Sequence, residues 1–167
     1  MDTRLAIASK RDIKTYDGTP ALAADLVERI LDAGRLSGSS KNAQRWTFVV
    51  VEDPARKAAL AKTVYAPENV EGAALVVAVL GKRDYDVGRA SQNMFLAAWN
   101  EGVGSSPTGV PDPAGAARAL GLESDEEVGI VLTFGYPARG RDPESRSAEE
   151  WSARANRKPL ADVVRRI

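Results

Sequence analysis

Three short segments carry side chains that could bind a charged or aromatic ligand. The first holds Lys10, Arg11 and Lys14, three cations within five residues. Guanidinium and ammonium groups at this spacing could grip a phosphate. The alternative is a solvated basic helix end, which the helix dipole favours. These residues alone leave both interpretations open.

The second segment, residues 38–46, begins with Gly38 and ends with Trp46. A connection needs Gly or Ser to turn, but it rarely gathers so many hydrogen-bonding side chains. Those side chains are Ser39, Ser40, Asn42 and Gln44. Loops on a rigid scaffold commonly carry binding groups. The alternative is a helix C-cap followed by an ordinary turn.

The third segment, residues 102–107, is rich in Gly and Ser. It looks like a dinucleotide-binding fingerprint, but Pro107 stands where that motif needs its last Gly, and the segment follows a predicted helix rather than a strand. A Rossmann-like nucleotide-binding module is therefore the least favoured function. Such a loop could still offer backbone N–H groups to a flat ligand, or be a plain connection. Arg157 could complete a phosphate site, or be a surface arginine.

The composition narrows the chemistry. The chain has no Cys and no His, which excludes thiolate nucleophiles, Cys/His zinc sites and Ser-His-Asp catalysis. If the chain is an enzyme, carboxylates, Lys, Tyr or an organic cofactor must carry the chemistry. A cofactor with its own redox chemistry fits best, because the protein then supplies only binding and orientation. The formal net charge is zero, so the composition shows no excess of positive charge for binding nucleic acid or a membrane surface. No apolar run could span a bilayer, no signal-peptide core is present, and we expect a cytoplasmic protein.

The length suits a single domain over residues 1–167. Apolar spacing and caps predict five helices, at residues 3–10, 20–33, 53–65, 84 or 86 to 99, and 112–120. The residues expected to cap or open them are, in order, Thr3, Thr19 followed by Pro20, Asp53, either Asp84 or Asp86, and Asp112. Continuous apolar runs predict buried strands at residues 47–51, 74–80 and 128–134. Residues 101–109 are predicted as a loop, and residues 140–156 as a loop with one helical turn.

The predicted strands lack polar alternation, which indicates a sheet covered on both faces. Their alternation with helices, taken alone, suggests a parallel α/β sheet. The helices are numerous for three strands, so we expect some of their apolar surface to face a second subunit.

In their order along the chain, these segments resemble the nitroreductase family of FMN-dependent oxidoreductases. Residues 10–16 resemble its Arg-Arg-Ser-x-Arg-x-Phe segment, and residues 38–46 its Pro-Ser-x-x-Asn-x-Gln-Pro-Trp segment. Residues 86–93 match its Asp-x-Gly-x-Ala-x-Gln-Asn helix. Gly-Tyr-Pro at 135–137 and Arg-x-Pro-Leu at 157–160 follow. The resemblance covers nearly the whole chain, and five motifs in order are fairly specific.

The resemblance implies an α+β fold with a mixed central sheet flanked by helices, in an intertwined homodimer with the flavin at the subunit interface. This overrides the parallel sheet. It also implies a set of cofactor-binding residues. Lys10, Arg11, Lys14 and Arg157 would hold the FMN phosphate, with Asp12 in the same segment; Ser39, Ser40 and Asn42, with Gln44 beside them, would reach the flavin from the partner subunit; Pro107, Thr108, Gly109 and Val110 would line the isoalloxazine; and Gly135 would lie near the phosphate.

The implied activity passes hydride from NADH or NADPH through the flavin to a small organic acceptor, such as a nitroaromatic or a quinone, in a ping-pong cycle. No side chain has to be a nucleophile. Two departures from the family pattern matter. Asp12 replaces a Ser beside the phosphate, and Ala155 stands where many relatives have a second late Lys. They support an alternative function as a flavin-binding carrier or sensor without reductase turnover.

Overall fold

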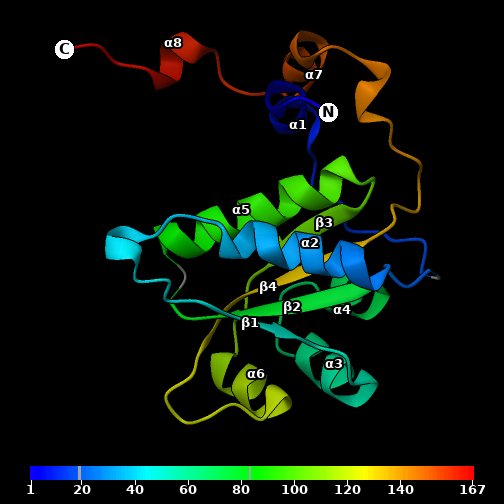
Figure 1. The fold of residues 1–167 in the computed structure, drawn as a ribbon, viewed down its shortest axis with the longest axis vertical. Coiled ribbons are helices and arrows are strands. Elements are labelled where there is room, and N and C mark those ends of the chain that lie inside the picture. The colour runs from blue at the N-terminus through cyan, green and yellow to red at the C-terminus, as the bar shows by residue number, and fades with distance from the viewer. Residues whose placement is uncertain (19, 83) are drawn as a thin grey trace. The chain divides into compact units, whose positions relative to one another are not determined.

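A computed structural model describes all residues except 19 and 83, and its contacts divide the chain into two units (Figure 1). The core unit is Arg11–Arg141, and the terminal unit combines Met1–Lys10 with Asp142–Ile167. We describe each unit by itself. The single domain expected from the length stays a prediction.

The core unit is built on a four-stranded sheet. Its strands are β1 (Thr47–Val50), β2 (Leu75–Leu80), β3 (Gly104–Thr108) and β4 (Val128–Gly135). Their order is β1-β2-β4-β3, and every neighbouring pair is antiparallel. The α+β fold is confirmed. The mixed pairing within the sheet is not found, since among the described residues a parallel pairing occurs only at the isolated bridge between Asp12 and Ser105.

Helices cover both faces of this sheet. They are α2 (Ala24–Arg35), α3 (Pro54–Ala61), α4 (Pro67–Gly72), α5 (Tyr85–Asn100) and α6 (Pro113–Leu120), with the 3-10 turn η1 (Ser40–Asn42) after α2. Figure 1 shows α2 and α5 on one face and α3, α4 and α6 on the other. Successive residues of β2 serve the two cores, since Val77 packs with Ile30 and Met94, whereas Val76 packs with Leu60. The prediction of a sheet buried on both faces is confirmed.

Aspartate caps set where three of these helices begin. The carboxylates of Asp53, Asp84 and Asp112 accept backbone N–H groups of the first turns of α3, α5 and α6, groups that have no partner within a helix. Gly121 ends α6 with φ 67°, in the left-handed region. The predicted caps of α3 and α6 are confirmed, and Asp84 rather than Asp86 opens α5.

Other boundaries differ from the prediction. Helix α2 begins at Ala24 rather than Pro20, and Thr19 lies outside the described residues. Leu22 still packs against the core on the α2 side, which explains its place in the apolar pattern. Helix α3 ends at Ala61, and the short helix α4, which was not predicted, follows it.

Strand β3 was predicted as a loop. Its sequence, Gly-Ser-Ser-Pro-Thr, has neither alternation nor large apolar groups, so it lacks a local strand signal. Pairing with β4 defines it instead, from Gly104 opposite Gly135 to Thr108 opposite Val131. The order of the sheet leaves β3 at one edge and β1 at the other.

The terminal unit contains helices from both ends of the chain. They are α1 (Thr3–Ser9), the 3-10 turn η2 (Pro143–Ser145), α7 (Ala148–Arg154) and α8 (Leu160–Val163). Helix α1 is capped by Asp2, not by Thr3. It packs on α7, where Arg4 pairs with Glu149 at 2.6 Å. No helix within the described part of the chain is long and apolar enough to cross a membrane.

Candidate functional site

Helix α5 holds the polar loop that follows α2. The carboxylate of Asp86 accepts the backbone N–H of Ser40 at 3.0 Å, and the side-chain amide of Asn93 donates to the Ser37 hydroxyl at 2.7 Å. Residues seven apart lie on one helix face. The Asp and the Asn of the 86–93 motif therefore position the loop.

The backbone of this loop is strained. Lys41, Asn42 and Gln44 have φ values of 53°, 55° and 47°, which are uncommon for residues other than Gly. The hydroxyl of Ser39 accepts the N–H of Gln44 at 2.9 Å and closes the turn. Residues Ser40, Asn42 and Gln44 are exposed. Strain held in place by surrounding contacts is typical of ligand-binding segments.

A second candidate segment, residues 11–17, crosses the ends of β3 and β4. The N–H of Ile13 donates to the carbonyl of Ser105 at 3.0 Å. Further along, the N–H of Asp17 donates to the carbonyl of Tyr136, and the N–H of Ala138 donates to that of Thr15. The structure thus brings Asp12 and Lys14 to the beginning of β3 and the end of β4.

Two glycines allow this close crossing. A Cβ on Gly104 would lie 2.7 Å from the Cβ of Ile13, and one on Gly135 would lie 2.9 Å from the ring of Tyr16. Contacts that short are not tolerated without movement. Gly135 is therefore explained by packing against Tyr16, and its place near a phosphate stays a prediction.

The hydroxyl of Tyr16 is buried against β4. It lies 2.8 Å from the hydroxyl oxygen of Thr133, which in turn donates to the carbonyl of Ser106. Burial raises the pKa of Tyr16 to about 12, the hydrogen bond with Thr133 opposes this rise, and the charge of Asp12 adds to it. Tyr16 thus anchors residues 11–17 as a neutral group.

A pocket of ≈ 310 Å³ opens between residues 12–15 and the chain that follows β4. Its charged lining residues are Asp12, Lys14, Arg139 and Arg141. The two arginines were not singled out from the sequence, because isolated loop arginines form no pattern. We call this the cationic pocket.

The remaining predicted phosphate residues are distributed over both units. Arg11 begins the core unit, whereas Lys10 and Arg157 belong to the terminal unit. There the N–H of Lys10 closes α1, and the guanidinium of Arg157 donates to the carbonyl of Ala155 at 3.0 Å. The part of these three residues in phosphate binding stays a prediction.

The far end of β3 carries polar atoms that lack partners. The hydroxyl of Thr108 and both side-chain polar atoms of Asn69 are buried without a hydrogen bond among the described residues. Their segments are neighbours, since the N–H of Tyr65 donates to the carbonyl of Gly109 at 3.1 Å. Buried polar groups without partners are costly, so they call for an explanation. Asn69 was not predicted, because a single Asn in a short segment gives no signal.

An amide and a hydroxyl can each donate and accept hydrogen bonds, which are the two kinds of contact that the edge of a flat heteroaromatic ring offers. Pro107 and Val110, predicted to line the same ligand, lie beside them, half-buried, in and just after β3. These residue types could pair with a flavin ring, and the position of that ring beside residues 107–110 stays a prediction.

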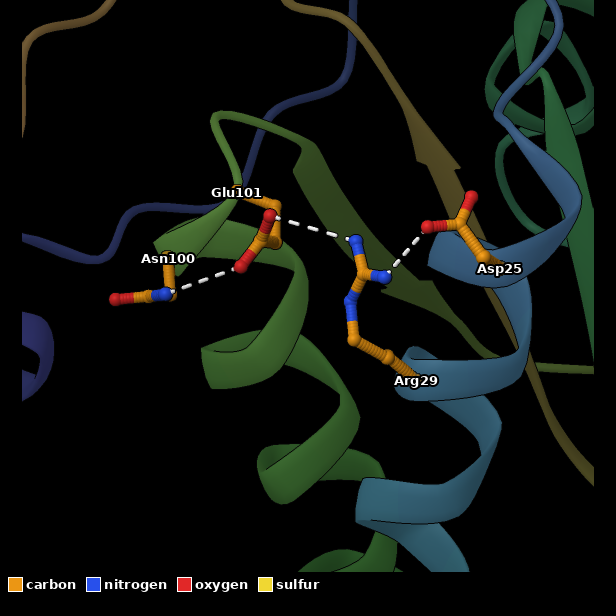
Figure 2. Close-up of polar contacts among 4 residues, drawn as sticks. All are labelled: Asp25, Arg29, Asn100 and Glu101. Carbon is orange, nitrogen blue, oxygen red and sulfur yellow. Dashed lines mark hydrogen bonds and ion pairs between the residues drawn. The ribbon is translucent and has the colours of Figure 1, made fainter.

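An arginine ties the helix pair at the turn that leads into β3. Figure 2 shows Arg29 of α2 between Asp25, at 2.6 Å, and Glu101, at 3.6 Å. The amide of Asn100 donates to the other oxygen of Glu101 at 3.2 Å. Because Glu101 follows α5 directly, these contacts fix the point at which the chain turns toward Gly104.

The loop after α2 and residues 11–17 lie at opposite ends of α5 (Figure 1). The loop is bound near the first turn of α5, and residues 11–17 cross β3 just after its last turn. A helix of 16 residues is about 24 Å long. The structure therefore does not bring Ser40 and Asn42 together with Lys14 inside one chain.

A broad groove of ≈ 1100 Å³ runs along α2 and reaches Trp46 and Phe48, whose rings are stacked with centroids 6.4 Å apart. Its arginines are neutralised locally, since Arg29 pairs with Asp25 and Arg35 with Asp32. Free positive charge thus distinguishes the cationic pocket from this groove.

Comparison with known proteins identifies the family. The family model described as "Nitroreductase family" matches residues 7–85 and 81–136. The chain belongs to the nitroreductase family. The matched part of the nitroreductase chain contains residues 11–17, the loop after α2, and β3. The cationic pocket extends beyond it to Arg139 and Arg141.

Individual relatives agree with this assignment. An NADH dehydrogenase of Thermus thermophilus is 28% identical, with 87% of this chain and 92% of the relative covered. The structure of a nitroreductase from Desulfovibrio desulfuricans in complex with FMN is 28% identical, with a TM-score of 0.79 and 98% and 96% of the two chains covered. A nitroreductase family protein from Clostridium difficile shares the fold at 18% identity, with a TM-score of 0.80 and coverage of 99% and 98%.

Proposed function

We propose that this nitroreductase-family protein is an FMN-dependent oxidoreductase that takes hydride from NADH or NADPH and passes it to a small organic acceptor, such as a nitroaromatic or a quinone, in ping-pong order. The Thermus thermophilus relative is named an NADH dehydrogenase, and the Desulfovibrio desulfuricans relative was solved with FMN. A chain without Cys or His suits chemistry that a cofactor carries.

The observation that carries the proposal is the placement of two complementary sites along β3. Cations gather where residues 11–17 pair with Ser105, and polar atoms without partners lie at Thr108. Three residues of strand separate these positions, or about 10 Å. That spacing suits a ligand with an anionic group on a five-carbon chain and a flat ring at the other end, which describes FMN.

The side chains would bind and orient the cofactor rather than react. Lys14 would hold the phosphate, and Asn69 and Thr108 would pair with the polar edge of the ring. A backbone N–H within residues 107–110 would lie near the reactive nitrogen. When bound, FMN would supply the hydride-accepting and electron-donating chemistry. The contribution of the protein is position and exclusion of water.

We further propose that the flavin lies at the interface of a homodimer. Ser39, Ser40, Asn42 and Gln44 stand about 24 Å from residues 11–17 of their own chain, by the length of α5. In a dimer they would serve the partner's flavin. The half-buried rings of Trp46 and Phe48 beside the α2 groove supply apolar surface for such an interface.

The test is to add FMN to the purified protein, remove the excess by desalting, and record the absorption spectrum. We expect flavin bands to stay with the protein and the loaded protein to oxidise NADH or NADPH when menadione or nitrofurazone is present. A protein that retains no flavin, and oxidises neither nucleotide with FMN supplied, would contradict the proposal. A retained flavin that neither nucleotide reduces would instead favour a carrier or sensor, in keeping with the carboxylate of Asp12 in the cationic pocket.

A further inference from the structure

We infer that Arg139 and Arg141, together with Lys14, form a cradle for a phosphate monoester in the cationic pocket. The inference rests on the proposed function and deepens it, since the ligand group would be the 5′-phosphate of FMN or the 2′-phosphate of NADPH. Neither arginine falls within the motifs that carry the family resemblance.

The first support is the charge of the pocket. Its lining has three cations, Lys14, Arg139 and Arg141, and one carboxylate, Asp12, which leaves a net charge of +2. A phosphate monoester carries about −1.5 to −2 at pH 7. The pocket as a whole thus complements that group, although Asp12 alone would repel it.

The second support is that these cations lack protein partners. Among the described residues, no hydrogen bond or ion pair involves the side chain of Lys14, Arg139 or Arg141. Elsewhere in the core unit, Arg29 and Arg35 pair with carboxylates within their own helix. Three unpaired cations around one pocket repel each other, and a bound anion would relieve that repulsion.

The third support is that the backbone fixes where the arginines begin. The N–H of Ala138 donates to the carbonyl of Thr15 at 3.1 Å, and Tyr16 pairs with Pro137. Arg139 directly follows the two residues that make these contacts, Pro137 and Ala138. Lys14 directly precedes their partners, Thr15 and Tyr16. The two paired segments therefore both contribute cations to the lining of one pocket.

The cradle also accounts for the two departures from the family pattern. Two extra arginines outweigh the charge of Asp12, and in number of cations they offset the lysine that the chain lacks at Ala155. The position of the pocket at the beginning of β3, about 10 Å before Thr108, favours the FMN phosphate as the source.

The experiment uses the full-length protein and the variants Arg139→Ala, Arg141→Ala and the double variant. A matched control removes two exposed cations elsewhere in the core unit, Arg118→Ala with Lys82→Ala. Dissociation constants for FMN and for riboflavin, which lacks the phosphate, are measured by flavin fluorescence. KM values are measured for NADPH and NADH with the flavin held saturating.

We expect the double variant to bind FMN about tenfold or more weakly, as for the loss of charge-assisted hydrogen bonds, with riboflavin binding and the control unchanged. Unchanged flavin binding with a KM raised about tenfold for NADPH but not for NADH would also support the cradle, and would assign it to the 2′-phosphate. Equal weakening of FMN and riboflavin, or no change in any constant, would overturn the inference while leaving the oxidoreductase intact.

If the wild-type protein binds no flavin at all, it is the proposed function that fails. The cradle is then judged by calorimetric titration of NADP⁺ and NAD⁺ into the wild type and the double variant. Preference of the wild type for NADP⁺, lost in the variant, would support it. Equal affinities, or no binding, would overturn it.

Discussion

The carboxylate of Asp86 and the backbone N–H of Ser40 form a 3.0 Å hydrogen bond between residues far apart in the sequence. This bond holds the strained loop after α2 against the first turn of α5. We expect Asp86→Ala to lower the free energy of unfolding by about 1 kcal/mol, measured by urea denaturation. Hydrogen exchange of the Ser40 backbone amide should become faster by more than the drop in the free energy of unfolding accounts for. Glu28→Ala, an exposed carboxylate without such a bond, is the control, and equal exchange in both variants would contradict the role of Asp86.

Gly104 and Gly88 should respond in opposite ways to the same substitution. In Gly104→Ala the new Cβ meets Ile13 at 2.7 Å, so we expect a loss of about 1–3 kcal/mol in thermal or urea unfolding. In Gly88→Ala the Cβ on α5 meets nothing within 4 Å, and we expect a gain of about 0.5–1 kcal/mol from helix propensity. If both variants are stabilised, residues 11–17 do not cross β3 as described.

The raised pKa of Tyr16 predicts that the folded protein loses stability at alkaline pH. Its pKa is raised from 10.0 to about 12 in the folded protein, mainly by burial. Above pH 10 the unfolded chain releases the proton first, so the stabilising contribution is complete below pH 10 and disappears toward pH 12. The loss should reach about 2–3 kcal/mol above pH 12, and about half of it should be present at pH 11. Urea unfolding at pH 8 and pH 11 measures it, and Tyr16→Phe should show a clearly smaller decline over the same interval; an equal decline would contradict this account.

Removing the negative charge from the cationic pocket should strengthen phosphate binding. We expect Asp12→Asn to lower the dissociation constant for FMN by several-fold, because one repulsive charge near the phosphate disappears. The gain should shrink in 0.5 M salt, where screening is short-ranged. Fluorescence titration at both salt concentrations measures it, with Glu52→Gln as an exposed control away from the pocket. Weaker binding in Asp12→Asn would mean that Asp12 orders the cations instead.

Substitution of Asn69 should change the stability of the protein and its affinity for the cofactor in different ways. Its amide is buried without a partner, so Asn69→Leu should leave the stability of the flavin-free protein unchanged or raise it by about 1 kcal/mol. If the amide pairs with the flavin ring, the same variant should bind FMN about tenfold more weakly. Thermal unfolding without FMN and flavin titration measure the two effects. A destabilised protein with normal FMN affinity would mean that a water-filled, purely structural site satisfies Asn69.

The sequence predicts those parts of the fold whose signals are local. Apolar runs predict β1, β2 and β4, because buried strands need such residues on both faces. Asp53 and Asp112 predict helix starts, because a carboxylate there binds N–H groups within its own turn. Strand β3 cannot be predicted in this way, because its residues are small and polar. They form a strand only by pairing with β4, which follows about twenty residues later.

The candidate site divides in the same way. Lys14 and the polar loop after α2 are recognisable because several functional groups lie close together in the chain. The sequence does not reveal Arg139, Arg141 or Asn69 as site residues. Each of them joins the candidate site only because its segment pairs with a segment far away in the sequence, at Thr15 or at Gly109. Even the 86–93 motif gains a new explanation from the structure, in which Asp86 and Asn93 hold a loop rather than a ligand.

The edge position of β3 also bears on how the folded protein avoids aggregation. An exposed edge strand offers N–H and carbonyl groups on which strands of other molecules can assemble. Residues 12 and 13 cover the beginning of β3 through the bridge at Ser105, and Pro107 further along has no N–H to offer an incoming strand. The opposite edge, β1, is only four residues long. Residues 12 and 13, which line the cationic pocket, therefore also reduce the edge-to-edge association of sheets from different molecules in concentrated solution.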